Sequence, residues 1–157
     1  MLRTILMSLL LLSTACASAQ PPQSEYMKLF TVQGEFEDVR ADVEMAITDR
    51  GMIINNVSHI GNMLARTGKD LGASKQIFVK AEALEFCSAT VSRRMMEADP
   101  HNIVFCPYII AIYTLPGEKG KVYVAFRRPL LVGSAESRAA LQAVEKLLDE
   151  IIADAIL

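Results

Sequence analysis

The feature that most constrains the fold is the apolar stretch at residues 103–113, which only Pro107 interrupts. A run of this kind is typical of a central strand that is covered on both faces. Because proline cannot donate a hydrogen bond to a neighbouring strand, we expect a bulge or the start of the strand at Pro107. The sequence therefore predicts a sheet built around this segment.

Alternation of apolar and polar residues predicts four further strands, at residues 26–32, 52–60, 77–87 and 121–127. A hairpin loop at residues 115–120, which contains Pro116 and Gly117, leads into the last of them. In the strand that Cys87 ends, the alternation predicts a buried face made of Ile77, Val79, Ala81 and Ala83.

Apolar residues three and four positions apart predict helices between the strands. The first helix ends at Gly51 and has the apolar positions Phe36, Val39, Val43, Ala46 and Ile47. A short helix and a loop follow at residues 61–72. Ser88 is suited to cap the next helix, which Asp99 and Pro100 end.

A long C-terminal helix is predicted after Ser134, which is suited to cap it. Its apolar stripe predicts that it lies across the sheet and consists of Leu141, Val144, Leu148, Ile151 and Ala155. The apolar end at Ile151 and Ile152 leaves a contact with a second subunit open as an alternative.

The first 19 residues have the pattern of a secretory signal peptide. Arg3 precedes an apolar run at residues 5–12, and Ala17-Ser18-Ala19 offers the small residues that signal peptidase requires. We therefore predict a signal peptide at 1–19, a polar tether at 20–25 and a domain at 26–157. The run is too short to span a bilayer, and no later stretch is long enough, so we predict a periplasmic protein with no transmembrane span. A lipid anchor at Cys16 stays open as a less favoured alternative.

The composition narrows the function classes. The chain has 157 residues, which fits one domain, and its 52% apolar content excludes a disordered protein. A formal net charge of −2 lacks the excess of Lys and Arg that binding to nucleic acid requires.

Cys87 and Cys106 are the two cysteines of the predicted mature chain. In an oxidising compartment they can form a disulfide. If the helix between them joined parallel strands, however, they would lie about a strand length apart, which is too far for a bridge. A second hypothesis makes Cys87 a reactive thiol, because the positive end of the helix that Ser88 caps favours a thiolate. A third leaves both cysteines buried and inert.

No catalytic constellation and no cofactor or metal site is predicted. The two histidines, His59 and His101, belong to no recognisable hydrolase motif, and no paired cysteine or histidine motif is present. The strongest metal hypothesis is a copper or haem site made of His59, Cys87 and Met96. Arg127 is a candidate clamp for an anionic ligand at the edge of the sheet, or a charged strand end that faces water.

The order and residues of these segments resemble the domain-of-unknown-function family 302. The matching segments are residues 84–87, 97–100, 105–108, 111–113 and 122–124, together with the first helix and its glycine at 36–51. The resemblance implies a single α+β domain in which a first helix and a long C-terminal helix pack on a curved, mostly antiparallel sheet, in a TBP-like arrangement. It also implies frequent export and often a homodimer. The family carries no established activity, so no catalytic role transfers to Cys87 or Tyr108.

The sequence therefore predicts a small periplasmic binding or accessory protein that is not an enzyme. We expect an apolar cleft between the sheet and the C-terminal helix, near Cys87 and Tyr108 and with Arg127 as a further candidate, to hold a small ligand or a partner protein. The alternative function is thiol-based redox or sulfur chemistry at Cys87, with Cys106 as the resolving cysteine. A copper or haem binder is the least favoured function.

Overall fold

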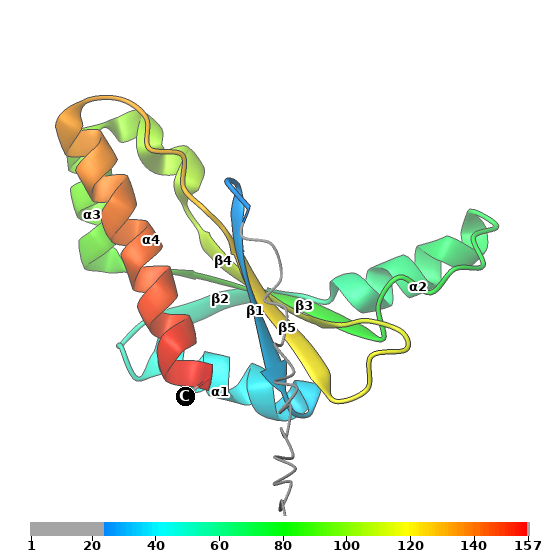
Figure 1. Ribbon diagram of the computed structural model, residues 1–157. Helices are drawn as coiled ribbons and strands as arrows, with labels where there is room; N and C mark the ends of the chain where they lie inside the picture. The colour runs from blue at the N-terminus through cyan, green and yellow to red at the C-terminus, as the bar shows by residue number, and fades with distance from the viewer. Residues whose placement is uncertain (1–23, 157) are drawn as a thin grey trace, which may run out of the picture.

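The computed structural model describes residues 24–156. The predicted signal peptide, Cys16 and most of the predicted tether lie outside the described residues. The elements in chain order are β1 (Met27–Gln33), α1 (Phe36–Thr48), β2 (Ile53–Ser58), α2 (Ile60–Asp70), β3 (Lys80–Cys87), α3 (Ala89–Ala98), the 3-10 helix η1 (Pro100–Phe105), β4 (Tyr108–Thr114), β5 (Lys121–Arg127) and α4 (Ala135–Ile156). Figure 1 shows their arrangement.

The five strands form one antiparallel sheet in the order β1-β5-β4-β3-β2, with β4 at its centre. Helices α1 and α4 pack against each other and on one face of this sheet, and α3 packs beside α4 (Figure 1). The predicted α+β architecture, with a first helix and a long C-terminal helix on an antiparallel sheet, is confirmed.

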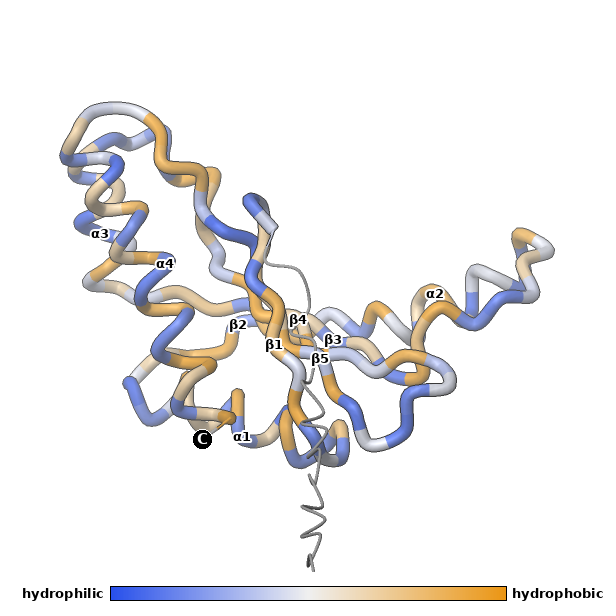
Figure 2. The backbone as a smooth tube through the Cα atoms, viewed as in Figure 1, coloured by the Kyte–Doolittle hydropathy of each residue, from blue (hydrophilic) through white to orange (hydrophobic). Residues whose placement is uncertain are grey.

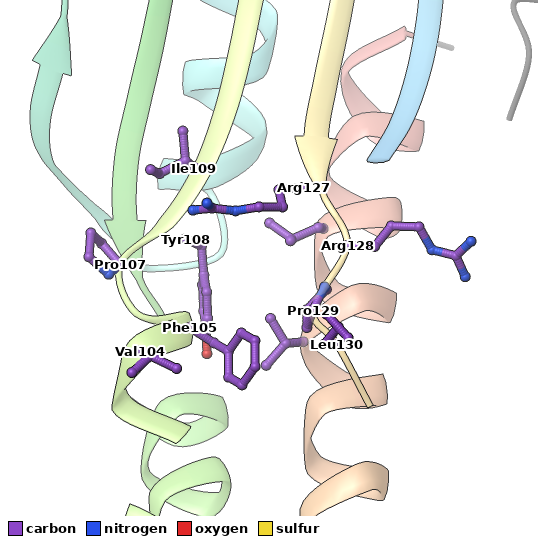
Figure 3. Close-up of a pocket in the computed structure, with 11 residues that line it drawn as sticks. Val104, Phe105, Pro107, Tyr108, Ile109, Arg127, Arg128, Pro129 and Leu130 are labelled. Carbon is purple, nitrogen blue, oxygen red and sulfur yellow. The ribbon is translucent and has the colours of Figure 1, made fainter. Parts of the chain in front are cut away.

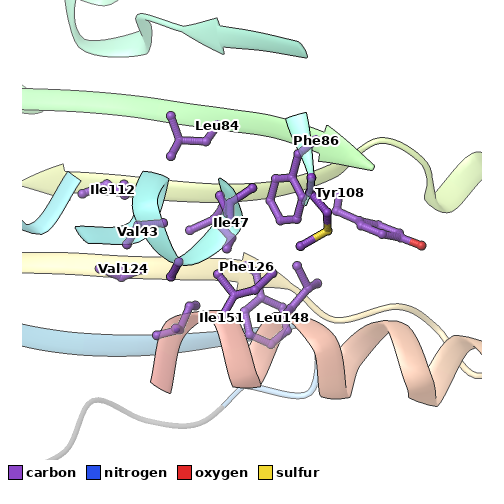
Figure 4. Close-up of a cluster of buried hydrophobic side chains, with 14 of the residues drawn as sticks. Val43, Ile47, Leu84, Phe86, Tyr108, Ile112, Val124, Phe126, Leu148 and Ile151 are labelled. Atoms are coloured by element: carbon purple, nitrogen blue, oxygen red, sulfur yellow. The ribbon is translucent and has the colours of Figure 1, made fainter. Parts of the chain in front are cut away.

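The core lies between the sheet and these helices (Figure 4). Every second residue of the three central strands points into it, since side chains alternate across a strand. The inward residues of these strands include Leu84, Phe86, Tyr108, Ile110, Ile112, Val122, Val124 and Phe126. Against them pack the apolar stripes of the two helices, including Val43 and Ile47 of α1 and Leu148 and Ile151 of α4.

The helix predictions from apolar spacing are confirmed. The buried residues of α1 are the five predicted ones. The hydroxyl oxygen of Ser88 accepts a hydrogen bond from the amide of Val91, and that of Ser134 accepts one from the amide of Ser137. Ile151 and Ile152 are fully buried in this chain's own core, so the end of α4 does not offer them to a second subunit.

The predicted strand at 103–113 is wrong in its first part. Residues 103–105 belong to η1, and β4 begins at Tyr108. Asp99 accepts a hydrogen bond from the amide of His101, and Pro100 stands at the first position of η1, so this turn is locally stabilised. Pro107 precedes the strand, as predicted, and the Cys106–Pro107 bond is cis.

The strand predicted at 77–87 begins later, and a different set of its side chains faces the main core. It starts at Lys80, which pairs with Thr114 at the end of β4; the carbonyl of Thr114 also accepts a hydrogen bond from the amide of Val79, so only the residues before Val79 lie beyond the end of the partner strand. Ile77 is half exposed. Ala81 and Ala83 are buried, as predicted, but they lie on the face of the sheet opposite the main core. Glu82 lies on the core side, where it pairs with Arg40 of α1.

The central strand is covered on one face, not two as predicted. The side chains on the other face belong to none of the core cluster. We call this side of the sheet the open face; its central residues are Ala83, Ile109, Ala111, Tyr113 and Ala125.

Helix α2 projects from the rest of the molecule (Figure 1), and none of its residues is buried. Apolar and hydrophilic segments both occur along it (Figure 2). Among the described residues, no helix has the length and apolar character needed to cross a membrane.

Asn102 joins three elements at one end of the core. Its side chain is 2% exposed, and its amide nitrogen donates to the carbonyl of Met95 at 3.0 Å and to the hydroxyl oxygen of Ser137 at 2.9 Å. It thereby fixes η1 to both α3 and the beginning of α4.

Replacing this side chain tests the junction. We expect Asn102→Ala to lower the free energy of unfolding by about 2 kcal/mol, because it leaves buried polar partners unsatisfied. Urea denaturation followed by circular dichroism measures the change. The matched control is Asn55→Ala at an exposed position, for which a change within about 0.5 kcal/mol is expected. Equal effects of the two substitutions would contradict this role.

Candidate functional site

The antiparallel pairing of β3 with β4 brings the two cysteines together. Phe86 pairs with Tyr108, so Cys87 at the end of β3 lies beside Cys106, just before β4. Their sulfur atoms are 2.8 Å apart, and both residues are partly exposed. The condition under which they would lie a strand length apart is not met, because β3 and β4 are antiparallel and the connection through α3 and η1 returns the chain to the same end of the sheet.

Ser92 of α3 connects this pair to Tyr108. Its hydroxyl oxygen lies 3.7 Å from the sulfur of Cys106 and 2.9 Å from the hydroxyl oxygen of Tyr108. Burial raises the pKa of Tyr108 to about 12, although its hydrogen bond with Ser92 acts in the opposite direction. Tyr108 is therefore a neutral phenol at physiological pH, and it can donate a hydrogen bond.

The local environment does not favour a thiolate at Cys87. Burial, together with the neighbouring Cys106, raises the pKa of Cys87 to about 11. Arg93, the cation in the first turns of α3, is exposed and pairs with Glu97. Burial and the neighbouring Cys106 thus outweigh the position of Cys87 near the start of α3, and Cys87 is a neutral thiol near pH 7.

The pH dependence of alkylation tests this conclusion. The thiolate is the reacting form, so the rate at which iodoacetamide modifies Cys87 in the reduced protein should rise about tenfold per pH unit and level off near pH 11. Mass spectrometry of the Cys106→Ser variant, in which Cys87 is the only cysteine of the predicted mature chain, separates the effect of Cys106. In this variant the alkylation rate of Cys87 should level off at a lower pH. A plateau near pH 8 in the unsubstituted protein would contradict the raised pKa.

A pocket of about 180 Å³ opens where β4 and β5 separate. The two strands pair only from Ile110 with Phe126 to Tyr113 with Tyr123, so the beginning of β4 and the end of β5 diverge. The chain before β4 and the chain after β5 form the two sides of this gap, and α4 closes its inner end. The lining residues are Val104, Phe105, Pro107, Tyr108, Ile109, Arg127, Arg128, Pro129, Leu130, Val144 and Leu148. We call it the fork pocket.

Apolar side chains make up the wall and the rim of the fork pocket. Figure 3 shows Phe105 and Tyr108 on one side and Pro129 and Leu130 on the other. Val104 at the rim is 75% exposed and Leu130 is 58% exposed. Val104 and Phe105 in the apolar second half of η1 and Leu130 in the apolar stretch after β5 all line the pocket. Large apolar side chains exposed around a pocket are typical of a binding site.

The two arginines at the fork pocket differ in their charge environment. Arg128 pairs with Glu145 of α4 at 3.0 Å, and Glu145 also pairs with Lys28 at 3.2 Å. Arg127 makes no ion pair with any side chain in residues 24–156, and it extends from β5 toward Ile109 (Figure 3). Its positive charge is therefore available to a ligand.

The structure thus places the sequence candidates at two adjacent locations. Tyr108 and Arg127 line the fork pocket, whereas Cys87 and Cys106 form a separate pair, with Cys106 next in sequence to the pocket wall. His59 lies elsewhere and contacts Glu82 at 2.9 Å. The described part of the chain contains no group of three or more His, Cys, Asp or Glu side chains arranged to hold a metal ion.

Sequence reasoning missed several residues of these sites. Ser92 lies on α3 without any motif, and Glu145 lies within a helix stripe rich in charged residues, so neither shows its role in the sequence. The segment at 130–132 could have been recognised from the sequence as a candidate binding surface. Three consecutive apolar residues outside a helix or strand are uncommon on a surface, and all three are exposed here.

An antiparallel sheet with helices on one face and a small pocket at the fork of two strands defines a single α+β domain. The chain belongs to the family described as Domain of unknown function DUF302, whose family model matches residues 29–155. A similar solved structure is that of an uncharacterized conserved DUF302 protein from Bacillus stearothermophilus. The two are 15% identical with a TM-score of 0.68, and the match covers 84% of this chain and 99% of the other. No curated protein matches the chain.

Proposed function

We propose that this protein is an exported, periplasmic binding protein that holds a small carboxylate with an apolar body in the fork pocket. The observation that carries the proposal is the combination of an apolar pocket with the unpaired guanidinium of Arg127 at its edge. The proposal develops the ligand cleft between the sheet and the C-terminal helix that the sequence predicts.

The size and lining of the pocket limit the ligand. A volume of about 180 Å³ is below the range of roughly 300–1,000 Å³ that drug-sized ligands occupy, so a single ring or a short chain fits. Phe105, Val144 and Leu148 offer it apolar contacts. A guanidinium binds a carboxylate with two parallel hydrogen bonds, which favours this anion over a neutral group.

A role in binding, not in catalysis, is supported by the arrangement of the polar groups. Nucleophilic catalysis requires a serine or cysteine within hydrogen-bond reach of a base. Within residues 24–156, neither His59 nor His101 forms a side-chain hydrogen bond with a serine or a cysteine. Export is supported by Arg3, the apolar run after it and the Ala17-Ser18-Ala19 pattern.

Benzoate is a suitable probe for the pocket, and benzyl alcohol is its neutral counterpart. We expect Arg127→Gln to weaken benzoate binding about five- to tenfold and to leave benzyl alcohol binding unchanged, because only the carboxylate pairs with the guanidinium. Ligand-observed NMR titration measures both affinities. Arg94→Gln, which removes the same charge from an exposed position of α3, is the matched control. If the protein bound neither probe, or if both arginine variants lost benzoate equally, the proposal would be overturned.

A second candidate function is a redox response of the Cys87–Cys106 pair, and the 2.8 Å separation of the sulfur atoms favours it. Two thiols release two protons and two electrons to form the bridge, while an oxidant of the disulfide class is reduced to two thiols. Because the pKa of Cys87 is raised to about 11, this exchange is slow near pH 7. The pair is thus suited to a lasting change of state instead of rapid turnover.

Oxidation should stabilise the fold. With oxidised glutathione as the oxidant, we expect the protein to lose two hydrogens in its intact mass and to gain about 3 kcal/mol in the free energy of unfolding, because the bridge constrains the unfolded chain. Dithiothreitol should reverse both changes. The Cys106→Ser variant should instead form a glutathione adduct and show no increase in the free energy of unfolding. A wild-type protein that accumulates glutathione adducts without forming the bridge would contradict this function.

A further inference from the structure

Helix α2 and the chain that returns from it to β3 form an arm outside the core. The arm comprises residues 60–77, and it leaves the sheet at Gly61, which lies close to the backbone of Ala81 in β3 (Figure 1). None of the residues of α2 is buried, and its 11 residues extend about 16 Å along the helix axis. The arm therefore presents its side chains to the surroundings and contributes none of them to the core of this chain.

One side of the arm is apolar. Ile60, Leu64 and Leu71 recur at helical spacing, and Met63 lies beside them on the same side of α2. Met63 is 43% exposed and Leu71 is 82% exposed, and Ile77 of the returning chain is 50% exposed. Leu64 and Ile77 also line a cavity of about 390 Å³ between α2 and the returning chain. Large apolar side chains exposed together are typical of a docking surface.

The remaining sides of the arm are basic. Arg66 borders the apolar side of α2, Lys69 lies across from it, and Lys75 follows on the returning chain, whereas Asp70 is the one carboxylate in the sequence of the arm. All three cations are exposed, and none forms an ion pair with another side chain of residues 24–156. The arm is thus positively charged in a chain whose formal net charge is −2.

Helix α2 lacks the contacts that stabilise a helix in water. A helix of 11 residues is marginal without tertiary packing, and Gly61 and Gly68 lower its helix propensity further. His59 at its N-terminus makes no side-chain capping hydrogen bond. An apolar surface outside this chain, packed against Met63 and Leu71, supplies the burial that α2 lacks.

We propose that the arm docks on the surface of an anionic lipid membrane. Met63 and Leu71 enter the boundary between the headgroups and the acyl chains, and the three cations pair with lipid phosphates. Helices with an apolar side and a basic polar side bind membranes in this way. A bilayer offers a layer of phosphate groups above an apolar layer, which matches the order in which the arm presents its cations and its apolar side chains. The rest of the chain is more negative than the whole, so an anionic surface attracts the arm alone.

Docking through the arm leaves the fork pocket open. The arm joins the sheet next to Lys80, which pairs with Thr114 at the end of β4, whereas the fork pocket lies at the beginning of β4. The two sites are therefore at opposite ends of the central strand, and the membrane proposal does not rest on ligand binding in the pocket.

Flotation with lipid vesicles tests the charge of the surface. We expect the protein to bind vesicles of equal parts phosphatidylglycerol and phosphatidylcholine at least tenfold more strongly than vesicles of phosphatidylcholine alone. Arg66→Gln/Lys69→Gln should weaken binding to the anionic vesicles at least tenfold, because each cation near an anionic surface contributes to the attraction. Arg94→Gln/Lys119→Gln removes the same charge from exposed positions outside the arm and is the matched control, with a change within about threefold.

Substitution of the apolar side tests insertion. We expect Met63→Ser/Leu71→Ser to weaken binding to the anionic vesicles about tenfold or more, because it removes the apolar area that the interface buries. Met45→Ser/Ile53→Ser, at exposed apolar positions outside the arm, should bind like the unsubstituted protein. These substitutions remove no buried side chain, and circular dichroism verifies that all four variants are folded.

Three outcomes would overturn the proposal. The first is no binding to the anionic vesicles, which would leave an acidic protein as the occupant of the arm. The second is equal binding to the two kinds of vesicle. The third is an arm variant, of either the charged or the apolar pair, that binds as strongly as its matched control.

Discussion

The pairing of β3 with β4 is the constraint on which the rest of the structure depends. This ladder runs from Lys80 with Thr114 to Phe86 with Tyr108, and it turns Leu84, Phe86 and Ile110 toward the helices. Because side chains alternate with a period of two, a shift by one residue would move all of them to the open face. The same register sets the two cysteines side by side and places Ala81, Ala83 and Ala111 on the open face.

The fork pocket follows from the limited length of the neighbouring ladder. Where β5 diverges from β4, consecutive arginines take different directions, since adjacent side chains of an extended chain point to opposite sides. Arg128 turns inward to the charged pair of Lys28 and Glu145, which fixes the segment after β5 to α4. Arg127 is left outward with its charge unpaired. The position of the strand divergence, more than any single motif, thus creates the fork pocket.

Much of the fold is predictable from local pattern. Helices α1 and α4 have long apolar stripes, and the hairpin before β5 has strong turn residues, so these elements were predicted correctly. The errors occur where tertiary contacts override local pattern. Lys80 and Glu82 face the core side because Glu37 and Arg40 of α1 neutralise them there. The residues at 103–105 are apolar enough for a strand, but the cap at Asp99 favours a turn. For the candidate site, Tyr108 and Arg127 were identified as separate candidates, whereas their common pocket depends on strand divergence that no sequence period reveals.

Helix α2 contributes no buried side chain, so the free energy of folding depends little on its sequence. Only its beginning is restricted, because a Cβ at Gly61 would lie 2.8 Å from the backbone nitrogen of Ala81. Between that point and Phe78, whose ring packs edge-on against Tyr113, folding leaves the chain free to change in length and composition during evolution while the sheet register is kept. The same segment is therefore the natural place to attach a spectroscopic label or an affinity tag without disturbing the core.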